Sequence, residues 1–240
     1  MHENFKAVQL AASLLHWKHV SSALFKVDIA KAFDAVNWNF LLAILRHMGF
    51  SRRWINWILL LLSTASTKII LNGQPGKRII HARGLCQGDP LSPLLFVLAM
   101  EPLNTLFRLA FSKQVFGAMG TANIPERIFL YADDVILFSS SAEQDLVAVG
   151  TILNMFAAAP GLHINPNKCA ITPIQCNLLE TASLMKFQPE GLQAFPIRYL
   201  GIPLSIYKSR KCDLQYLVDK VVVGLPTWKA GLLTKAGVQF

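Results

Sequence analysis

Two adjacent carboxylates, Asp133 and Asp134, interrupt an apolar run that extends from Ile128 to Phe138. The residues on both sides favour β-strands, so the pattern predicts a hairpin with both acids at its tip. Asp is also common in ordinary solvated turns, and the pair alone does not separate a turn from a chemical site. The interpretation depends on which other groups join the pair.

A third carboxylate, Asp28, ends a strand-like run that begins at Ala23. If this strand lies beside the acidic hairpin, the three carboxylates meet at one sheet edge and repel one another unless a cation neutralises them. Carboxylate oxygens suit Mg²⁺, which keeps coordination positions for water and substrate phosphate. Two such ions about 4 Å apart can activate an attacking oxygen and stabilise a leaving oxygen in phosphoryl transfer. We therefore expect this site to hold a pair of divalent ions.

The composition favours a folded protein with a polyanionic partner. Hydrophobic residues make up 53% of the 240 residues, and 23 Lys and Arg against 14 Asp and Glu give a formal charge of +9. A charge of this sign favours nucleic acid as the partner. An anionic membrane surface is the alternative, but no basic amphipathic helix favours it.

Membrane, secretory and zinc-binding classes receive no support from the sequence. The longest apolar runs are far shorter than the ~20 residues of a membrane span, and the first residues lack the pattern of a signal peptide. The four cysteines have no Cys-x-x-Cys spacing and no His at ligand spacing, which disfavours a zinc site. We expect an intracellular protein with reduced thiols.

Helical and strand patterns interleave along the chain, and the two expected hairpins predict an α+β fold with a mainly antiparallel sheet flanked by helices. The second hairpin is expected to join Thr67–Leu71 to Lys77–His81 through the loop 72–76, and its cations either face phosphates or are simply solvated. Another strand is expected at Asn167–Thr172. Helices are expected at Asn4–Trp17, at Trp38–Met48 after Asn37, from Ser51 to Leu62, at Pro93–Phe111 after Ser92, from a Ser141 capping box to Ala159, and at Cys212–Val223.

Five segments resemble, in order, the signature blocks of reverse transcriptases, and the nearest resemblance is to those of plant LINE-type (non-LTR) retrotransposons. The first segment, 25–34, contains Asp28, and the second, 84–96, contains the sequence Gln-Gly-Asp-Pro. The third is the Tyr-Ala-Asp-Asp (YADD) motif at 131–134. The segments 161–168 and 199–204 resemble the two blocks that follow. The resemblance therefore runs across most of the chain.

The resemblance implies a right-hand polymerase palm with partial fingers over residues 1–205 and the beginning of a thumb over residues 206–240. It implies an RNA-directed DNA polymerase that extends a DNA primer on an RNA template with deoxynucleoside triphosphates, in the nucleus or the cytoplasm. Two Mg²⁺ ions would serve the reaction, with Mn²⁺ able to replace them. No membrane partner is expected, and the oligomeric state stays open.

The resemblance also implies roles for individual residues. Asp28, Asp133 and Asp134 hold the metal ions, and Lys168 protonates the departing pyrophosphate, although a Lys at a strand edge is often only solvated. Phe33 packs under the sugar and excludes a ribose 2′-hydroxyl, unless it is an ordinary core residue. The residues expected to contact nucleotide or template are Ile29, Phe33, Gln87, Gly88 and Tyr131. Those expected to grip the primer are Tyr199, Leu200 and Gly201.

Two departures from the family pattern qualify these expectations. Cys86 stands where relatives commonly carry a basic or otherwise different residue before Gln-Gly-Asp-Pro. The upstream part of the fingers, the rest of the thumb and an endonuclease domain are expected to lie outside this chain. The alternative hypothesis is therefore a catalytically inactive nucleic-acid-binding remnant of a decayed retroelement.

Overall fold

The fold is built on a four-stranded antiparallel sheet. The computed structural model describes residues 2–119, 124, 126–158, 161–188, 191–207, 215, 219 and 220. The strand order is β4-β5-β1-β6, and every neighbouring pair is antiparallel. These strands are β1 (Ser22–Asp28), β4 (Ile128–Tyr131), β5 (Asp134–Ser139) and β6 (Ala170–Ile174). The predicted α+β class with an antiparallel sheet flanked by helices is confirmed.

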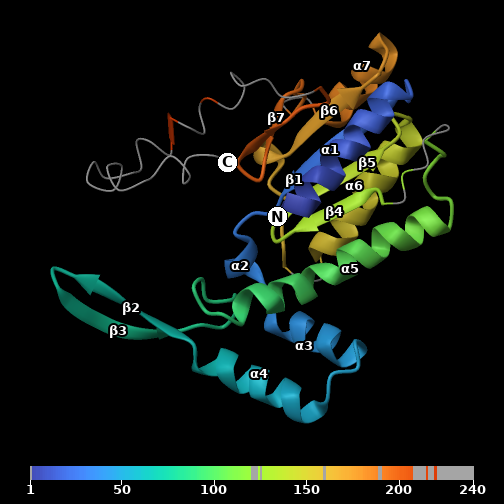
Figure 1. Cartoon of the computed structure of the whole chain (residues 1–240). Helices are drawn as coiled ribbons and strands as arrows, with labels where there is room; N and C mark the ends of the chain where they lie inside the picture. Colours follow the sequence, from blue (N-terminus) through green and yellow to red (C-terminus); the bar gives the residue numbers. More distant parts are fainter. Residues whose placement is uncertain are drawn as a thin grey trace, which may run out of the picture.

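Both faces of the sheet are covered, which explains why its strands are apolar on both sides. On one face Phe25, Val27 and Leu137 pack into the main core. That core includes residues of α3 (Trp38–His47), α5 (Ser92–Ser112) and α6 (Glu143–Ala158). On the other face Leu24 and Ile136 pack with α1 (His2–Trp17) and with the hairpin β7 (Ile197–Tyr199)–β8 (Ile202–Leu204). Figure 1 shows α1 crossing the sheet beside this hairpin.

A second hairpin projects away from the rest of the molecule (Figure 1). Its strands, β2 (Ser66–Leu71) and β3 (Gln74–Ile80), are exposed at every residue. The hairpin follows α4 (Arg52–Thr64) and leads into the loop before α5. The remaining short elements are α2 (Ala32–Ala35), the 3₁₀ turn Pro166–Lys168 and α7 (Leu178–Phe187).

Two of the predicted helix starts are confirmed. The side chain of Asn37 accepts hydrogen bonds from the backbone N–H groups of Asn39 and Phe40, and the Ser51 hydroxyl accepts from the N–H of Trp54. The tip of the projecting hairpin is shorter than predicted. Asn72 and Gly73 form the turn alone, both with positive φ, because such residues match the twist of a two-residue hairpin.

Two predicted N-caps, Ser92 and Ser141, are wrong, although the helices expected after them form as α5 and α6. Ser92 is already helical, and its hydroxyl donates to the carboxylate of Asp89, which also accepts from the N–H of Leu91. The helix expected after Ser141 begins at Glu143, and the Ser141 hydroxyl bonds that of Ser21 instead. The strand expected to start at Asn167 begins at Ala170, because the turn Pro166–Lys168 precedes it.

Helix α7 was not predicted. Asn177 and Glu180 form a capping box at its start. The predicted helix at Cys212–Val223 lies mostly outside the described residues, as does most of the expected thumb segment 206–240.

Among the described residues one helix, α5, is long and apolar enough to cross a membrane by length and composition. The same helix contributes Phe96, Leu103 and Phe107 to the main core. It also carries Glu101 and Arg108, which interrupt the apolar run in the sequence. Packing against the rest of the core accounts for the apolar residues on the buried side of α5.

Candidate active site

The register of β1 and β5 brings the predicted carboxylates together. Asp28 lies directly opposite Asp134, and Asp133 sits in the two-residue turn between β4 and β5. Opposite residues of an antiparallel pair have Cβ atoms about 5 Å apart, on the same face. Ala132, the first residue of the turn, has φ of 51°, a conformation that non-Gly residues rarely adopt. The predicted meeting of the strand end and the hairpin tip is confirmed.

The electrostatics of this edge favour a bound cation. Burial raises the pKa of the Asp134 carboxyl, Lys26 opposes the rise, and the charges of Asp133 and Asp28 add to it. Among the described residues, no group of three or more His, Cys, Asp or Glu side chains is arranged to hold a metal ion. The donor set nevertheless fits a hard divalent cation, because all three groups offer carboxylate oxygens whose mutual repulsion a cation would relieve.

Lys26 is a site residue that sequence reasoning missed. It lies two residues before Asp28 on β1, hence on the same face of the sheet. Its Nζ donates to the backbone carbonyl of Arg198 at 2.9 Å, which joins the sheet to the β7–β8 hairpin. The alternation of the strand could have placed Lys26 on the acidic face, but no sequence signal indicates its contact with Arg198.

The loop that contains Gln87 and Gly88 is fixed at its base to the segment after Asp28. The N–H of Gly84 donates to the carbonyl of Val36 at 2.8 Å, and the indole N–H of Trp38 donates to the carbonyl of Gly84 at 2.7 Å. Gly84 has φ of 83°, and a Cβ there would lie 2.7 Å from the carbonyl oxygen of Asp34. Only glycine therefore fits this position without displacing the backbone.

A solvent-facing hollow of about 470 Å³ lies between this loop and the base of the β2–β3 hairpin. Gln87 forms part of its wall, and Arg83 provides a cation there. Gln87 and Gly88 are both exposed. The loop is thus anchored at one end and accessible at the other.

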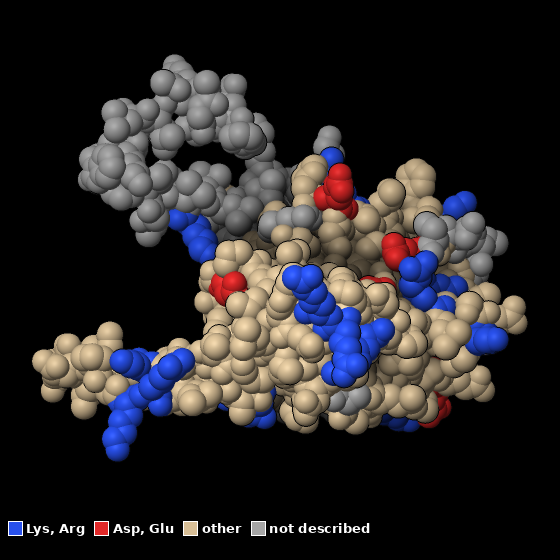
Figure 2. Space-filling model, turned by 90° about the horizontal axis from the view of Figure 1, so that it is seen from below, with Lys and Arg blue, Asp and Glu red and all other residues tan. Residues whose placement is uncertain are grey.

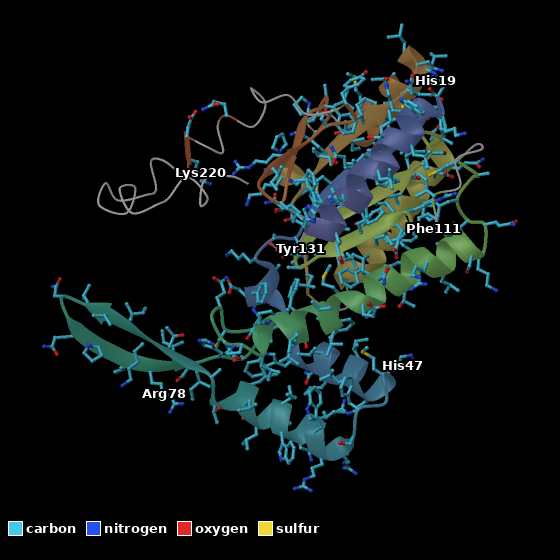
Figure 3. All side chains as sticks on the ribbon, in the orientation of Figure 1. His19, His47, Arg78, Phe111, Tyr131 and Lys220 are labelled. Atoms are coloured by element: carbon cyan, nitrogen blue, oxygen red, sulfur yellow. The ribbon has the colours of Figure 1, made fainter. Side chains whose placement is uncertain are left out.

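The other residues expected to contact nucleotide or template differ in their accessibility. Phe33 is half-buried and stacks on the core residue Phe96, with ring centroids 4.5 Å apart. One face of the Phe33 ring therefore packs as an ordinary core residue would. Ile29 is buried and bridges to Ile164. Tyr131 is 38% exposed at the end of β4, where Figure 3 labels it. Only Tyr131 of these three presents much of its side chain to solvent.

Lys168 and Tyr199 lie in contrasting surroundings. Lys168 is exposed on the 3₁₀ turn that precedes β6. Tyr199 is fully buried, and its hydroxyl bonds the Asn4 side chain at 2.6 Å, while burial raises the pKa of the phenol. Leu200 and Gly201, both with positive φ, form the turn of this hairpin. The Tyr199 side chain is therefore a core group, and the accessible part of the expected primer grip is the turn.

Positive charge is concentrated in one part of the chain. Residues 35–88 contain seven Lys and Arg and no Asp or Glu. Three of these cations, Lys68, Lys77 and Arg78, lie on the projecting hairpin. Figure 2 shows the hairpin as an arm with basic side chains, and Figure 3 labels Arg78 on it.

Comparison with known proteins assigns the family. Residues 3–204 match the family model described as reverse transcriptase (RNA-dependent DNA polymerase). The Pol polyprotein of the retrotransposable element R2DM of Drosophila melanogaster is 27% identical over 88% of this chain, which spans 20% of that protein. The Xenopus laevis transposon TX1 149 kDa protein is 29% identical over 84% of this chain and 15% of its own length. Telomerase from Candida albicans, solved with a fragment of telomeric RNA, shares the fold with a TM-score of 0.56 at 13% identity, over 93% of this chain and 40% of that one.

Proposed function

The chain belongs to the reverse transcriptase family, and on that premise we propose that it is the palm of an enzyme that extends a DNA primer along an RNA template. Its relatives are Pol proteins of non-LTR retrotransposons, and we assign it to a plant LINE-type element on its signature blocks. Residues 1–205 form the palm with part of the fingers, and residues 206–240 begin the thumb. The chain spans about a fifth of the R2DM protein, so other domains of such a protein stand outside this proposal.

The observation that carries the proposal is the register that places Asp28 opposite Asp134, with Asp133 in the adjoining turn. These three carboxylates would hold two Mg²⁺ ions, which Mn²⁺ can replace. When bound, the ions activate the primer 3′-hydroxyl and stabilise the leaving pyrophosphate. Lys26 lies beside Asp134 and offsets part of the negative charge at this edge.

The surrounding residues orient the substrates. Gln87 and Gly88, on the anchored loop beside the hollow, contact the template strand and the incoming nucleotide. Tyr131 borders the same substrates from β4, and the backbone at Ile29 lies next to the metal site. The exposed edge of Phe33 packs under the sugar, and Lys168 donates a proton to the departing pyrophosphate. The turn at Leu200 and Gly201 approaches the primer, with Tyr199 fixing the hairpin beneath it.

The basic segment 35–88 would bind the nucleic-acid backbone. Lys and Arg neutralise phosphates and release counterions, which gives affinity without sequence preference. An RNA/DNA hybrid is recognised largely through its backbone and its A-like shape, so base-reading side chains are not required. An intracellular location, in the nucleus or the cytoplasm, follows from these substrates.

Primer extension tests the proposal. The purified chain is given an RNA template, a DNA primer and deoxynucleoside triphosphates with Mg²⁺, and the same reaction is run with a chelator. We expect extension by the wild-type protein and by Glu143→Gln, which alters an exposed carboxylate at the start of α6, and none by Asp28→Asn. Equal extension by all three proteins would refute the metal site.

The alternative, a nucleic-acid-binding remnant, predicts a different result. Such a protein would bind an RNA/DNA hybrid with a steep salt dependence, yet wild type and Asp28→Asn would both fail to extend the primer. Binding and extension measured on the same preparations therefore separate the two functions.

A further inference from the structure

The ladder between β1 and β6 stops short of the carboxylate at the end of β1. The last paired residues are Lys26 and Ala170, because β6 is preceded by the 3₁₀ turn Pro166–Lys168 rather than by further strand. The backbone of Asp28 therefore has no partner in β6. Its polar groups need other partners, since an unmade backbone hydrogen bond is costly where water is excluded.

A thiol takes the place of a β6 residue as the partner of the Asp28 N–H. The N–H of Asp28 donates to the sulfur of Cys169 at 3.4 Å, and the same sulfur lies 3.9 Å from the carbonyl oxygen of Asp28. Cys169 is only 8% exposed, so the thiol is largely shielded from water. A thiol is able both to accept a hydrogen bond and to donate one.

The contact belongs to a larger hydrogen-bonded unit. The carbonyl of Asp28 accepts from the N–H of Asn165 at 2.9 Å, and the carbonyl of Asn165 accepts from the N–H of Cys169 at 3.1 Å. On the far side, the Gln188 amide donates to the carbonyls of Pro166 and Cys169 at 2.8 and 3.0 Å. The turn that carries Lys168 and the strand end that carries Asp28 are therefore held as one unit.

We infer that Cys169 is a positioning residue, whose thiol fixes the backbone of Asp28 relative to the turn bearing Lys168. The inference rests on the proposed function, which places metal ions at Asp28. Loss of the thiol would leave the Asp28 N–H unpaired and let the carboxylate shift. Small misplacements of reacting groups are expensive, about 100-fold in rate for about 1 Å.

The chain supplies a matched control at the other end of the same strand. The Cys176 thiol donates to the carbonyl of Ser22 at 3.2 Å, so Cys176→Ala also removes a thiol that bonds the β1 backbone. Ser22 lies at the opposite end of β1 from Asp28. We expect Cys169→Ala to lower kcat roughly tenfold with KM for template–primer unchanged, whereas Cys176→Ala leaves both constants within about twofold of wild type. Cys169→Ser keeps a donor and acceptor and should restore kcat.

A second measurement reads the hydrogen bond without activity. Amide hydrogen exchange at Asp28 should be faster in Cys169→Ala than in wild type, and slow again in Cys169→Ser. If wild type extends primers while Cys169→Ala matches Cys176→Ala in kcat and in exchange at Asp28, only the role of Cys169 is overturned. A wild-type protein that binds template–primer but extends nothing refutes the proposed function, and the catalytic role of Cys169 with it.

Discussion

Replacing Asp134 by Asn should stabilise the protein in the absence of divalent metal. Asp134 faces Asp28 across the β1–β5 pair, and Asp133 is its neighbour in the turn. Like charges directly opposite one another on a sheet destabilise it by up to about 1 kcal/mol, and partial exposure to solvent keeps the effect from being larger. A gain of about 1 kcal/mol corresponds to a rise in Tm of about 2–4 °C for a chain of this size.

The pH dependence of this gain has a defined sign. The pKa of the Asp134 carboxyl is raised in the folded protein, chiefly by burial. Protonation of Asp134 therefore stabilises the folded protein. This stabilisation is complete below the ordinary Asp pKa of about 3.9, and it is lost as the pH rises through the raised pKa of the folded protein. The Asn variant has no such loss. The difference in Tm should therefore be near zero at acidic pH and largest at neutral pH.

Thermal unfolding followed by circular dichroism, in chelator and then in Mg²⁺, measures both effects. In Mg²⁺ at about ten times its Kd, wild type should gain about 1.4 kcal/mol, and the variant less. Asp145→Asn is the control, because the buried Asp145 carboxylate accepts hydrogen bonds from the N–H of Gly117 and should lose stability on the same substitution. A fall in Tm for Asp134→Asn in chelator, like that of the control, would show that the Asp134 charge does not destabilise the metal-free protein.

Two further predictions concern the loop and the hairpin. Gly84→Ala should destabilise the protein by more than about 1 kcal/mol and reduce primer extension, because the new Cβ meets the backbone of Asp34. Thermal unfolding and primer-extension assays measure the two effects. Wild-type stability together with wild-type extension would contradict the prediction. Replacing Lys68, Lys77 and Arg78 together by Ala should make the binding of an RNA/DNA hybrid less dependent on salt. The magnitude of the slope of log affinity against log salt should fall by roughly 2 to 3. An unchanged slope in fluorescence anisotropy titrations would exclude the hairpin from phosphate contact.

The acidic edge was predictable because its determinants are local. Asp28 ends a strand pattern, and Asp133 and Asp134 interrupt another, so each carboxylate is placed by its own strand. Ordinary antiparallel pairing then brings the two strand ends together. The antiparallel sheet itself followed from the same periodicity.

The support for that edge could not be predicted, because it depends on contacts between residues far apart in the sequence. The bond from Asp28 to Cys169 spans 141 positions, and that from Lys26 to Arg198 spans 172. Nothing in the sequence around Cys169 or Lys26 indicates which residue its side chain will contact. The error at Ser92 has a local cause, since the Ser92 hydroxyl donates to the Asp89 carboxylate, which also accepts from the N–H of Leu91.

Single-nucleotide incorporation by wild type and Asp133→Asn is the most direct test of the metal site. Both proteins are saturated with an RNA template, a DNA primer, one deoxynucleoside triphosphate and Mg²⁺, so differences in binding do not contribute. We expect incorporation by wild type and a rate at least about 1000-fold lower for the variant, since an essential metal ligand is lost. Equal rates for the two proteins would contradict the assignment of the Asp133 hairpin as the metal site.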